Sequence, residues 1–272
     1  MNASEAIAEM VARTNLSLVI FTVGLMMCRI VPMLVLSPFL GGEAVPNEIK
    51  IGTGVTLSIV LFPAVRDTMG SIPTSAFPYI GLMLKELFLG VTMAFCVNVV
   101  FDAVRSAGTV IDTMSGSNNS QIYAPQLGQQ VSLYADIKFQ ITVVLFLTLN
   151  GHHLVIEALA DSFVLVPLDR FPRFHQGVWP FFDLLIRAFG ELMKISLSIA
   201  APAMLAAFLT DLALGIVNRV APQLQVFFIS MAIKPLVAAI VTFLSLSLVM
   251  GRLQTEFVAM LRVLRHALFL LS

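Results

Sequence analysis

The chain alternates long apolar runs with short polar connections. The apolar runs cover residues 16–40, 51–65, 76–101, 139–168, 181–217, 223–250 and 256–271. A helix needs about 20 mostly apolar residues to cross a bilayer. The connections are short, as expected within one compact helical unit. This pattern predicts an all-α, membrane-associated protein in which residues 1–272 form a single domain.

Prolines and charges interrupt several of these runs. Pro63 closes the second run early, the first run contains Arg29 and Pro32, and the third carries Lys85 and Glu86. Interrupted, charge-bearing segments are tolerated in a membrane only where they face protein or a water-filled cavity. We therefore expect bent helical hairpins that are broken at prolines.

The composition indicates the same class of protein. The chain is 58% hydrophobic and 12% charged with no net charge, whereas soluble domains average about 45–50% and about 25%. This apolar excess requires a membrane or a large apolar assembly. Balanced charge without blocks of like sign leaves no footprint for nucleic acid. No nucleotide-binding or nucleophile motif occurs, so we expect neither a cofactor nor enzyme activity.

Both cysteines and the first residues have simple interpretations. Cys28 and Cys96 lie in apolar runs, where an inert buried thiol is expected. Residues 1–13 are net acidic and precede a long apolar run. A secretory signal begins with basic residues and has a shorter apolar core, so no cleaved signal peptide is expected.

One polar connection differs from the others. Residues 111–136 are rich in Ser, Asn, Gln and Gly and carry charge only at Asp112 and Asp136. This composition favours turns over packed structure. A polar loop of about twenty residues is uncommon inside a compact domain and is usually functional or disordered. Its position between two apolar helices favours a functional loop.

Residues 202–220 fit a helix that begins at Pro202 and ends before Pro222. At 100° per residue, one face of this helix collects small and polar residues, namely Ala207, Asp211, Gly215 and Asn218, with Arg219 at its edge. Asp211 and Arg219 lie about 12 Å apart along the axis. Because this distance is too long for an ion pair, each needs another partner.

A second helix is expected from Gln223, with an interruption at Pro235 directly after Lys234. Two interpretations of the charges in these helices remain open. They pair within the chain, as buried charges normally do. Alternatively, the small-and-polar face docks other subunits, because Ala207 and Gly215 allow close backbone approach.

Residues 149–157 offer a weak metal motif. His153 and Glu157 are four residues apart and share a helix face, but the adjacent His152 points about 100° away. No third ligand follows at a suitable spacing. A packing role is therefore favoured, with Gly151 relaxing the backbone.

Motifs along nearly the whole chain resemble one family. They are SPFLGGEAVPNEIK after Arg29, then KELFLG, AGTVIDTMSG, FLTLNGHH, ADSFVLVPL and, over residues 215–234, GIVNRVAPQLQVFFISMAIK. Their order and spacing resemble the FliR/SctT family (YscT-, SpaR- and HrcT-like proteins), the R/T component of the flagellar and virulence type III export gate. The last motif is the most specific one.

The resemblance implies a non-enzymatic structural and gating subunit of a protein export channel. It implies assembly with P-type (FliP/SctR) and Q-type (FliQ/SctS) subunits, and contact with the B/U-type switch protein and the large A/V-type export protein. Further expected partners are secreted polypeptides and membrane lipid. Family members form part of a helical cone in the bacterial inner membrane, with much of the mass toward the periplasmic side.

The resemblance also implies roles for three sets of residues. The channel-plugging loop matches Ser115, Gly116, Ser117, Asn118, Asn119, Ser120, Gln121, Ile122, Tyr123, Ala124 and Pro125. Subunit contacts are expected at Asp211, Gly215, Asn218, Arg219, Pro222, Gln223 and Lys234. Structural roles are expected at Arg29, Pro38, Pro46, Glu86, Gly90, Gly108, Gly151, His152, Ser162 and Pro167. The chain departs from the family pattern at Met114, where Gln is usual, and at Ala124, where Asp is usual.

Two other functions fit the composition. A secondary transporter for a small solute has broken helices around a site near the middle of the membrane, together with an internal repeat. No convincing repeat relates the two halves of this chain. A purely structural membrane scaffold, without a lumen, is the other alternative.

Overall fold

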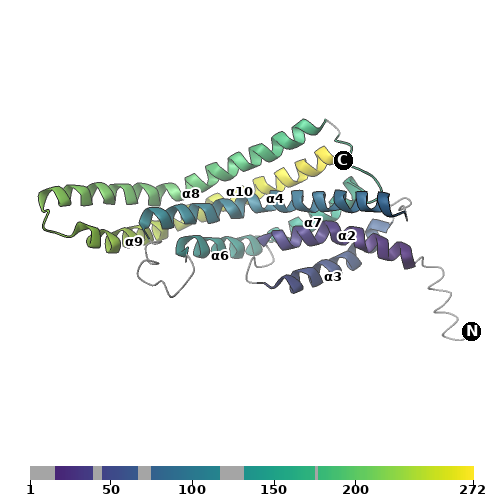
Figure 1. Ribbon diagram of the computed structural model, residues 1–272, viewed down its shortest axis with the longest axis horizontal. Helices are drawn as coiled ribbons and strands as arrows, with labels where there is room; N and C mark the ends of the chain where they lie inside the picture. The colour runs from purple at the N-terminus through teal and green to yellow at the C-terminus, as the bar shows by residue number, and fades with distance from the viewer. Residues whose placement is uncertain (1–15, 39–44, 67–74, 117–131, 175–176) are drawn as a thin grey trace, which may run out of the picture. The chain divides into compact units, whose positions relative to one another are not determined.

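The computed structural model describes residues 16–38, 45–66, 75–116, 132–174 and 177–272. These residues form helices joined by turns, with no strand among them, so the all-α prediction is confirmed. Figure 1 shows the helices α2 (Leu16–Leu36), α3 (Asn47–Arg66), α4 (Ala76–Ser115), α6 (Leu133–Thr148), α7 (Gly151–Leu165), α8 (Val178–Val220), α9 (Val226–Leu244) and α10 (Leu246–Leu271).

Several of these helices have the length and composition of membrane spans. Within the described ranges, five helices qualify individually, namely α2, α3, α4, α8 and α9. Helices α6 and α7 add a sixth span if they count together as one broken span. Between them, Asn150 adopts a left-handed conformation with φ 58°. The number of apolar helices identifies a membrane protein.

The helix start predicted at Pro202 is wrong, because Pro202 lies inside α8. The interruption expected at Pro235 is also not found, since α9 continues through this residue. Pro32 and Pro63 are likewise interior residues of α2 and α3. A proline removes one backbone hydrogen bond from a helix. In a long apolar helix, unravelling the chain would expose many more unpaired amide groups, so the helix continues.

The other helix boundaries lie closer to those predicted from the sequence. Helix α8 ends at Val220, before Pro222, as predicted. Helix α9 begins at Val226 and not at Gln223, because the intervening residues form a turn in which the Leu224 amide donates to the Ala221 carbonyl at 3.0 Å. At the polar connection 111–136, both flanking helices extend further than the composition indicates, to the bounds given above for α4 and α6.

The chain forms two compact units, each assembled from separate segments. Unit 1 contains the described residues within 1–98, 150–185 and 261–272. Unit 2 contains those within 99–149 and 186–260. Helices α4, α8 and α10 therefore contribute residues to both units.

Each unit has its own core. In unit 1, α2 packs against α3 and buries one face completely, at Leu25, Met26, Ile30, Met33 and Leu34. These positions recur at helical spacing. In unit 2, the centre is an aromatic cluster in which Phe101, Phe146 and Phe257 join α4, α6 and α10, with ring centroids 5.1 to 5.6 Å apart. Such aromatic pairs add to the energy of apolar burial.

Candidate functional site

A buried ion pair connects α2 and α4 in unit 1. Arg29 lies on the buried face of α2, and Glu86 follows Lys85 in the KELFLG motif of α4. The side chains of Arg29 and Glu86 are both fully buried. The Arg29 guanidinium donates from Nε to Oε2 of Glu86 and from Nη2 to Oε1, the latter at 3.0 Å. Paired hydrogen bonds of this kind fix both position and orientation.

The remaining donors of Arg29 bind the C-terminal end of α7. Nη1 donates to the carbonyl oxygen of Ser162 at 2.7 Å and to its hydroxyl at 3.0 Å, and Nη2 donates to the carbonyl oxygen of Val166 at 2.8 Å. The guanidinium also lies 4.4 Å from the ring centre of Phe163. The last carbonyls of a helix lack helical partners and carry negative partial charge. Arg29 therefore satisfies this helix end.

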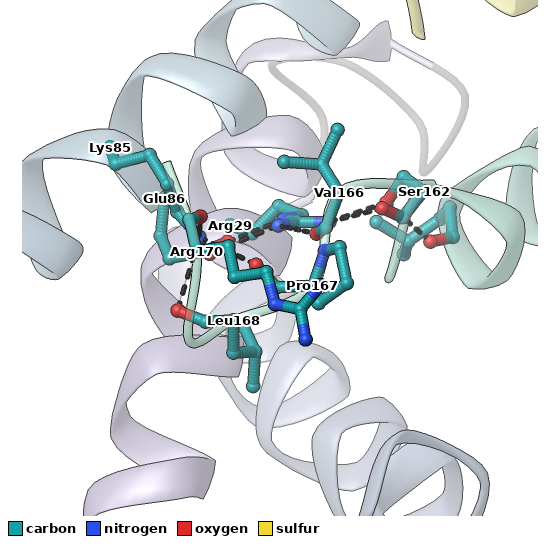
Figure 2. A network of polar contacts seen from close by, with 9 residues as sticks. Arg29, Lys85, Glu86, Ser162, Val166, Pro167, Leu168 and Arg170 are labelled. Atoms are coloured by element: carbon teal, nitrogen blue, oxygen red, sulfur yellow. Dashed lines mark hydrogen bonds and ion pairs between the residues drawn. The ribbon is translucent and has the colours of Figure 1, made fainter. Parts of the chain in front are cut away.

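Lys85 provides a second buried cation in the same network. Its ammonium group forms an ion pair with Glu86 and donates to three backbone carbonyls after α7, those of Pro167 at 3.0 Å, Leu168 at 3.2 Å and Arg170 at 3.1 Å. Figure 2 shows these contacts converging on the chain segment that follows α7. We use the name cation network for Arg29, Lys85 and Glu86 with their carbonyl partners.

A glycine allows the helices of the cation network to approach. A Cβ atom at Gly90, one turn after Glu86, would overlap the backbone carbonyl of Arg29. Only glycine permits this separation of α2 and α4, because every other residue carries a Cβ atom. The structure thus brings together five residues for which structural roles are expected: Arg29, Glu86, Gly90, Ser162 and Pro167.

Sequence reasoning missed Lys85 as a member of this network. The available signal was a lysine next to a glutamate inside an otherwise apolar run, since ionisable residues in membrane helices normally have a specific partner. The partners themselves could not be read from the sequence, because three of them are backbone carbonyls more than eighty positions away.

The other expected structural residues lie outside the cation network. Pro38 is buried just after α2, and the exposed Pro46 precedes α3, where its carbonyl accepts from the Ile49 amide at 3.1 Å. Gly151 and His152 begin α7. The Nδ1 atom of His152 is buried without a hydrogen-bond partner, and its ring stacks on His153 with the centroids 4.1 Å apart.

No metal centre is formed in the described part of the chain. Across these residues, no three His, Cys, Asp or Glu side chains are close enough to share an ion. Glu157, which the sequence places near His153, instead has its Oε1 atom 3.9 Å from Nη2 of Arg265. The metal motif considered from the sequence therefore has no third ligand among the described side chains.

In unit 2, one carboxylate ties together the two ends of the polar connection. Asp112, near the end of α4, accepts hydrogen bonds from the backbone amides of Tyr134 and Ala135 in the first turn of α6, each at 3.1 Å. These amides have no helical acceptor, and a carboxylate at a helix N-terminus is electrostatically favourable. Gly108 permits this contact, because a Cβ atom there would overlap the backbone of Ala135.

Most of the expected plug loop lies outside the described residues. Ser115, whose hydroxyl donates to the Asp112 carbonyl at 3.2 Å, and Gly116 are described. Residues 117–125 are not. Asp112 and Tyr134 were missed as site residues, although Asp112 is one of only two charges in the polar connection.

Helices α8 and α9 of unit 2 present an extensive apolar surface. Only Ala238 is buried in α9, and beyond Ala207 no residue of α8 is buried. We name this pair of segments, residues 205–220 and 226–244, the exposed hairpin. Its large exposed side chains are Leu205, Phe208, Leu209, Leu212, Ile216, Val217, Val220, Phe227, Phe228, Ile229, Ile233, Leu236, Ile240, Phe243 and Leu244.

An ion pair joins the two arms of the exposed hairpin. Lys234 of α9 pairs with Asp211 of α8, at half-exposed positions. Of the two interpretations left open by the sequence, the structure realises pairing within the chain for these two charges. The neighbouring carbonyl of Pro235 accepts a hydrogen bond from the Tyr134 hydroxyl at 3.0 Å. The exposed hairpin is thereby linked to the first turn of α6.

The remaining expected contact residues lie near the tip of the exposed hairpin. Gly215 and Asn218 line a shallow depression of about 560 Å³, together with residues 224–228. Pro222 and Gln223 lie in the turn and are exposed, as is Arg219. Across the described residues, Arg219 has no ion-pair partner. The structure therefore places polar groups that are free to bind other molecules at one end of an apolar hairpin.

Comparisons with known proteins agree with these features. The model of a family described as "Bacterial export proteins, family 1" matches residues 20–260. The chain is 28% identical over 249 residues to the flagellar biosynthetic protein FliR of Bacillus subtilis (strain 168), covering 91% of this chain and 95% of that protein.

Two further relatives show the range of the family. One is the flagellar biosynthetic protein FliR of Pectobacterium carotovorum subsp. carotovorum, which is 30% identical over 205 residues, 75% of this chain and 76% of that protein. The other is the Yop proteins translocation protein T of Yersinia pestis, which is 27% identical over 234 residues, 86% of this chain and 87% of that protein. Since the family model spans most of the sequence, this chain belongs to the bacterial export proteins, family 1.

Proposed function

We propose that this protein is a subunit of the bacterial type III export apparatus in the inner membrane, where it helps to build and gate the channel for unfolded polypeptides. The observation that carries this proposal is the family match over residues 20–260. Relatives of similar length are named for flagellar biosynthesis and for the translocation of Yop proteins. The role is structural, and transport energy comes from other components.

The exposed hairpin is the proposed contact with P-type and Q-type subunits. Its arms expose large apolar side chains along most of their length, whereas a helix with one solvated face would carry mainly polar residues there. An apolar surface of this extent requires cover from protein or lipid. Asn218, Arg219 and Gln223 at the tip supply polar groups that lipid would not satisfy. Protein subunits provide both apolar cover and hydrogen-bond partners.

Co-purification tests this assembly. Arg219→Ala should reduce recovery of the partner subunits with the tagged protein from detergent, because a charged contact is lost. Lys194→Ala is the matched control, since Lys194 is an exposed cation in the same helix that pairs locally with Glu191. Undiminished recovery with Arg219→Ala would remove Arg219 from the interface, and absence of these partners from the wild-type complex would refute the assembly itself.

The loop of residues 115–125 is proposed to occlude the channel until substrate arrives. A neutral polar loop seals by hydrogen bonding without binding charged substrates strongly. Support comes from the two helices that flank the polar connection, because Asp112 near the end of α4 accepts hydrogen bonds from the amides of Tyr134 and Ala135 in the first turn of α6. These contacts hold the end of α4 close to the start of α6.

Deleting residues 117–124 tests the occluding role. The deletion should raise ion leakage through cells that contain the assembled apparatus, while the subunits still co-purify. A loop of the same length and composition in scrambled order separates sequence-specific closure from simple filling of the lumen. Unchanged conductance in a fully assembled complex would exclude the plug, and unchanged secretion in a strain lacking this protein would exclude the export function.

A further inference from the structure

An open cavity in unit 1 lies where α7 and α10 end. Its volume is about 240 Å³, and its walls come from the last turn of α7, the segment that follows α7, and the last residues of α10. The lining residues are Val164, Leu165, Val166, Pro167, Arg170, Phe171, Arg173, Leu271 and Ser272. They combine two guanidinium groups with exposed apolar side chains and include no Asp or Glu.

The charge at this cavity is positive. Asp169 neighbours the cavity, and its carboxylate lies 3.5 Å from Nε of Arg170 and also attracts Lys85. With Asp169 counted, the cation network of Arg29, Lys85 and Glu86 has no net charge. Arg170 and Arg173 therefore add two positive charges, of which one remains in excess if a carboxylate at Ser272 is included.

The arginines of the cavity are available for a ligand. The side chain of Arg170 is 64% exposed, whereas that of its ion-pair partner Asp169 is only 12% exposed. The exposed side of the Arg170 guanidinium therefore keeps donors for a second anion. Arg173 is exposed and has no ion-pair partner in the described residues. An anion that reaches both guanidiniums would gain charge-assisted hydrogen bonds.

The cation network gives the cavity a rigid wall. Lys85 and Arg29 bind the backbone carbonyls of four residues after α7, those of Val166, Pro167, Leu168 and Arg170. Figure 2 shows the Arg170 carbonyl turned toward Lys85 while its side chain extends away beside Pro167. Because this part of the backbone is already held, the cost of ordering it at binding is reduced.

Aromatic residues indicate that this end of unit 1 meets the membrane surface. Phe77 begins one candidate span and Trp179 begins another, and they are 88% and 74% exposed. Phe171, on the rim of the cavity, is also exposed, and it lies against α4 at Gly81. Tryptophan at the end of an apolar helix is typical of the membrane–water interface, and the exposed Phe77 and Phe171 add apolar surface in this unit.

We propose that this cavity binds an anionic phospholipid. The phosphate group lies between the guanidiniums of Arg170 and Arg173, and the acyl chains lie along Val164, Leu165 and Phe171. A phosphate accepts hydrogen bonds from guanidinium groups in a bidentate manner. Free phosphate would bind the same guanidinium groups, but it has no apolar part that could pack against the apolar wall of the cavity. The occupant is therefore a lipid and not a soluble anion.

The test uses the full chain, with its co-expressed partners, reconstituted in vesicles of phosphatidylcholine with or without phosphatidylglycerol. Bound lipid is counted by native mass spectrometry after transfer to detergent. The wild type should retain phosphatidylglycerol in preference to phosphatidylcholine. Each arginine near an anionic surface contributes about a fivefold factor, so the double variant Arg170→Gln, Arg173→Gln should lower this preference by about twenty-five-fold.

Controls separate this site from general attraction to the membrane. Arg66→Gln removes an exposed arginine at the end of another candidate span and should leave the preference unchanged. The proposal would be overturned if Arg66→Gln lowered the preference for phosphatidylglycerol as much as the double variant does, or if the double variant left this preference unchanged. Displacement of the lipid by inorganic phosphate alone would assign the cavity to a soluble anion instead. Unchanged subunit recovery and an unchanged circular dichroism spectrum verify that the variants fold. The count of bound lipid does not depend on export activity, so a failure of export alone would leave this proposal standing.

Discussion

Glu86 is the only carboxylate in direct contact with the Arg29 guanidinium among the described residues, and the two lie 57 positions apart in the sequence. Glu86 also pairs with Lys85, so one buried anion serves two buried cations. The remaining hydrogen-bond acceptors for these two cations are backbone carbonyls at and after the end of α7. Glu86 therefore links α4 to α2 directly, and Arg29 extends this link to α7.

Glu86→Gln should destabilise the protein strongly. The substitution leaves two buried cations without their counter-charge, and breaking a buried ion pair in this way costs about 3–5 kcal/mol. Thermal unfolding of the purified protein in detergent measures the effect. Glu191→Gln is the control, because Glu191 and Lys194 form an exposed pair, which is worth at most about 1 kcal/mol. Equal effects of the two substitutions would show that the cation network contributes no more than a surface pair.

Gly90→Ala should separate α2 from α4. The added methyl group overlaps the carbonyl of Arg29, and overpacking of this kind costs about 1–3 kcal/mol. Gly190→Ala in α8 provides the opposite case, because no atom lies within 4 Å of the added Cβ. There, alanine should stabilise the helix by about 0.5–1 kcal/mol. Unfolding by heat distinguishes the two, and a stabilising Gly90→Ala would contradict the close contact.

Asp112→Ala should loosen the start of α6. The amides of Tyr134 and Ala135 lose their acceptor, and loss of such a cap costs about 0.5–2 kcal/mol. Hydrogen exchange should become faster at these two amides while exchange in α9 is unchanged. Asp136→Asn is the matched control, because Asp136 is exposed in the same turn and holds neither amide. Exchange that is no faster in Asp112→Ala would mean that the loop ends are held by other contacts.

The pair Asp211–Lys234 should show a small coupling energy. Its side chains are 52% and 23% exposed, and exposed ion pairs contribute about 0.2–1 kcal/mol. A double-mutant cycle with Asp211→Asn and Lys234→Gln measures the coupling in the purified protein and again in the complex with partner subunits. The coupling energy should be the same in the complex as in the purified protein, because the ion pair stays intact on assembly. A coupling that vanishes on assembly would indicate that the charges exchange this internal pair for partners on other subunits.

Some features of the site were accessible from the sequence. The motif residues Arg29, Glu86 and Gly90 were expected to have structural roles, and the structure brings them into one network. Asp112 was recognised only as a charge bordering the polar connection, because its ligands are two backbone amides. Backbone groups carry no sequence signal, so neither the contacts of Lys85 nor those of Asp112 follow from residue identity.

The sequence by itself determined the class of the protein. Apolar runs of membrane length specify helices wherever they occur, because a backbone in an apolar medium must satisfy its hydrogen bonds internally. The motifs around Arg29, Glu86 and Asn218-Arg219 likewise indicated the family.

Only the tertiary structure decided which charges pair and where the helices end. Asp211 and Lys234 come together because α8 and α9 fold back on each other, and Arg29 reaches α7 because the helices of unit 1 pack closely. The helices also continue through Pro202 and Pro235, against the local preference of proline. Local helix preferences amount to about 1 kcal/mol or less per residue, and to about 3 kcal/mol for proline. Charge pairing and helix continuity depend instead on the summed contacts of segments distant in the chain.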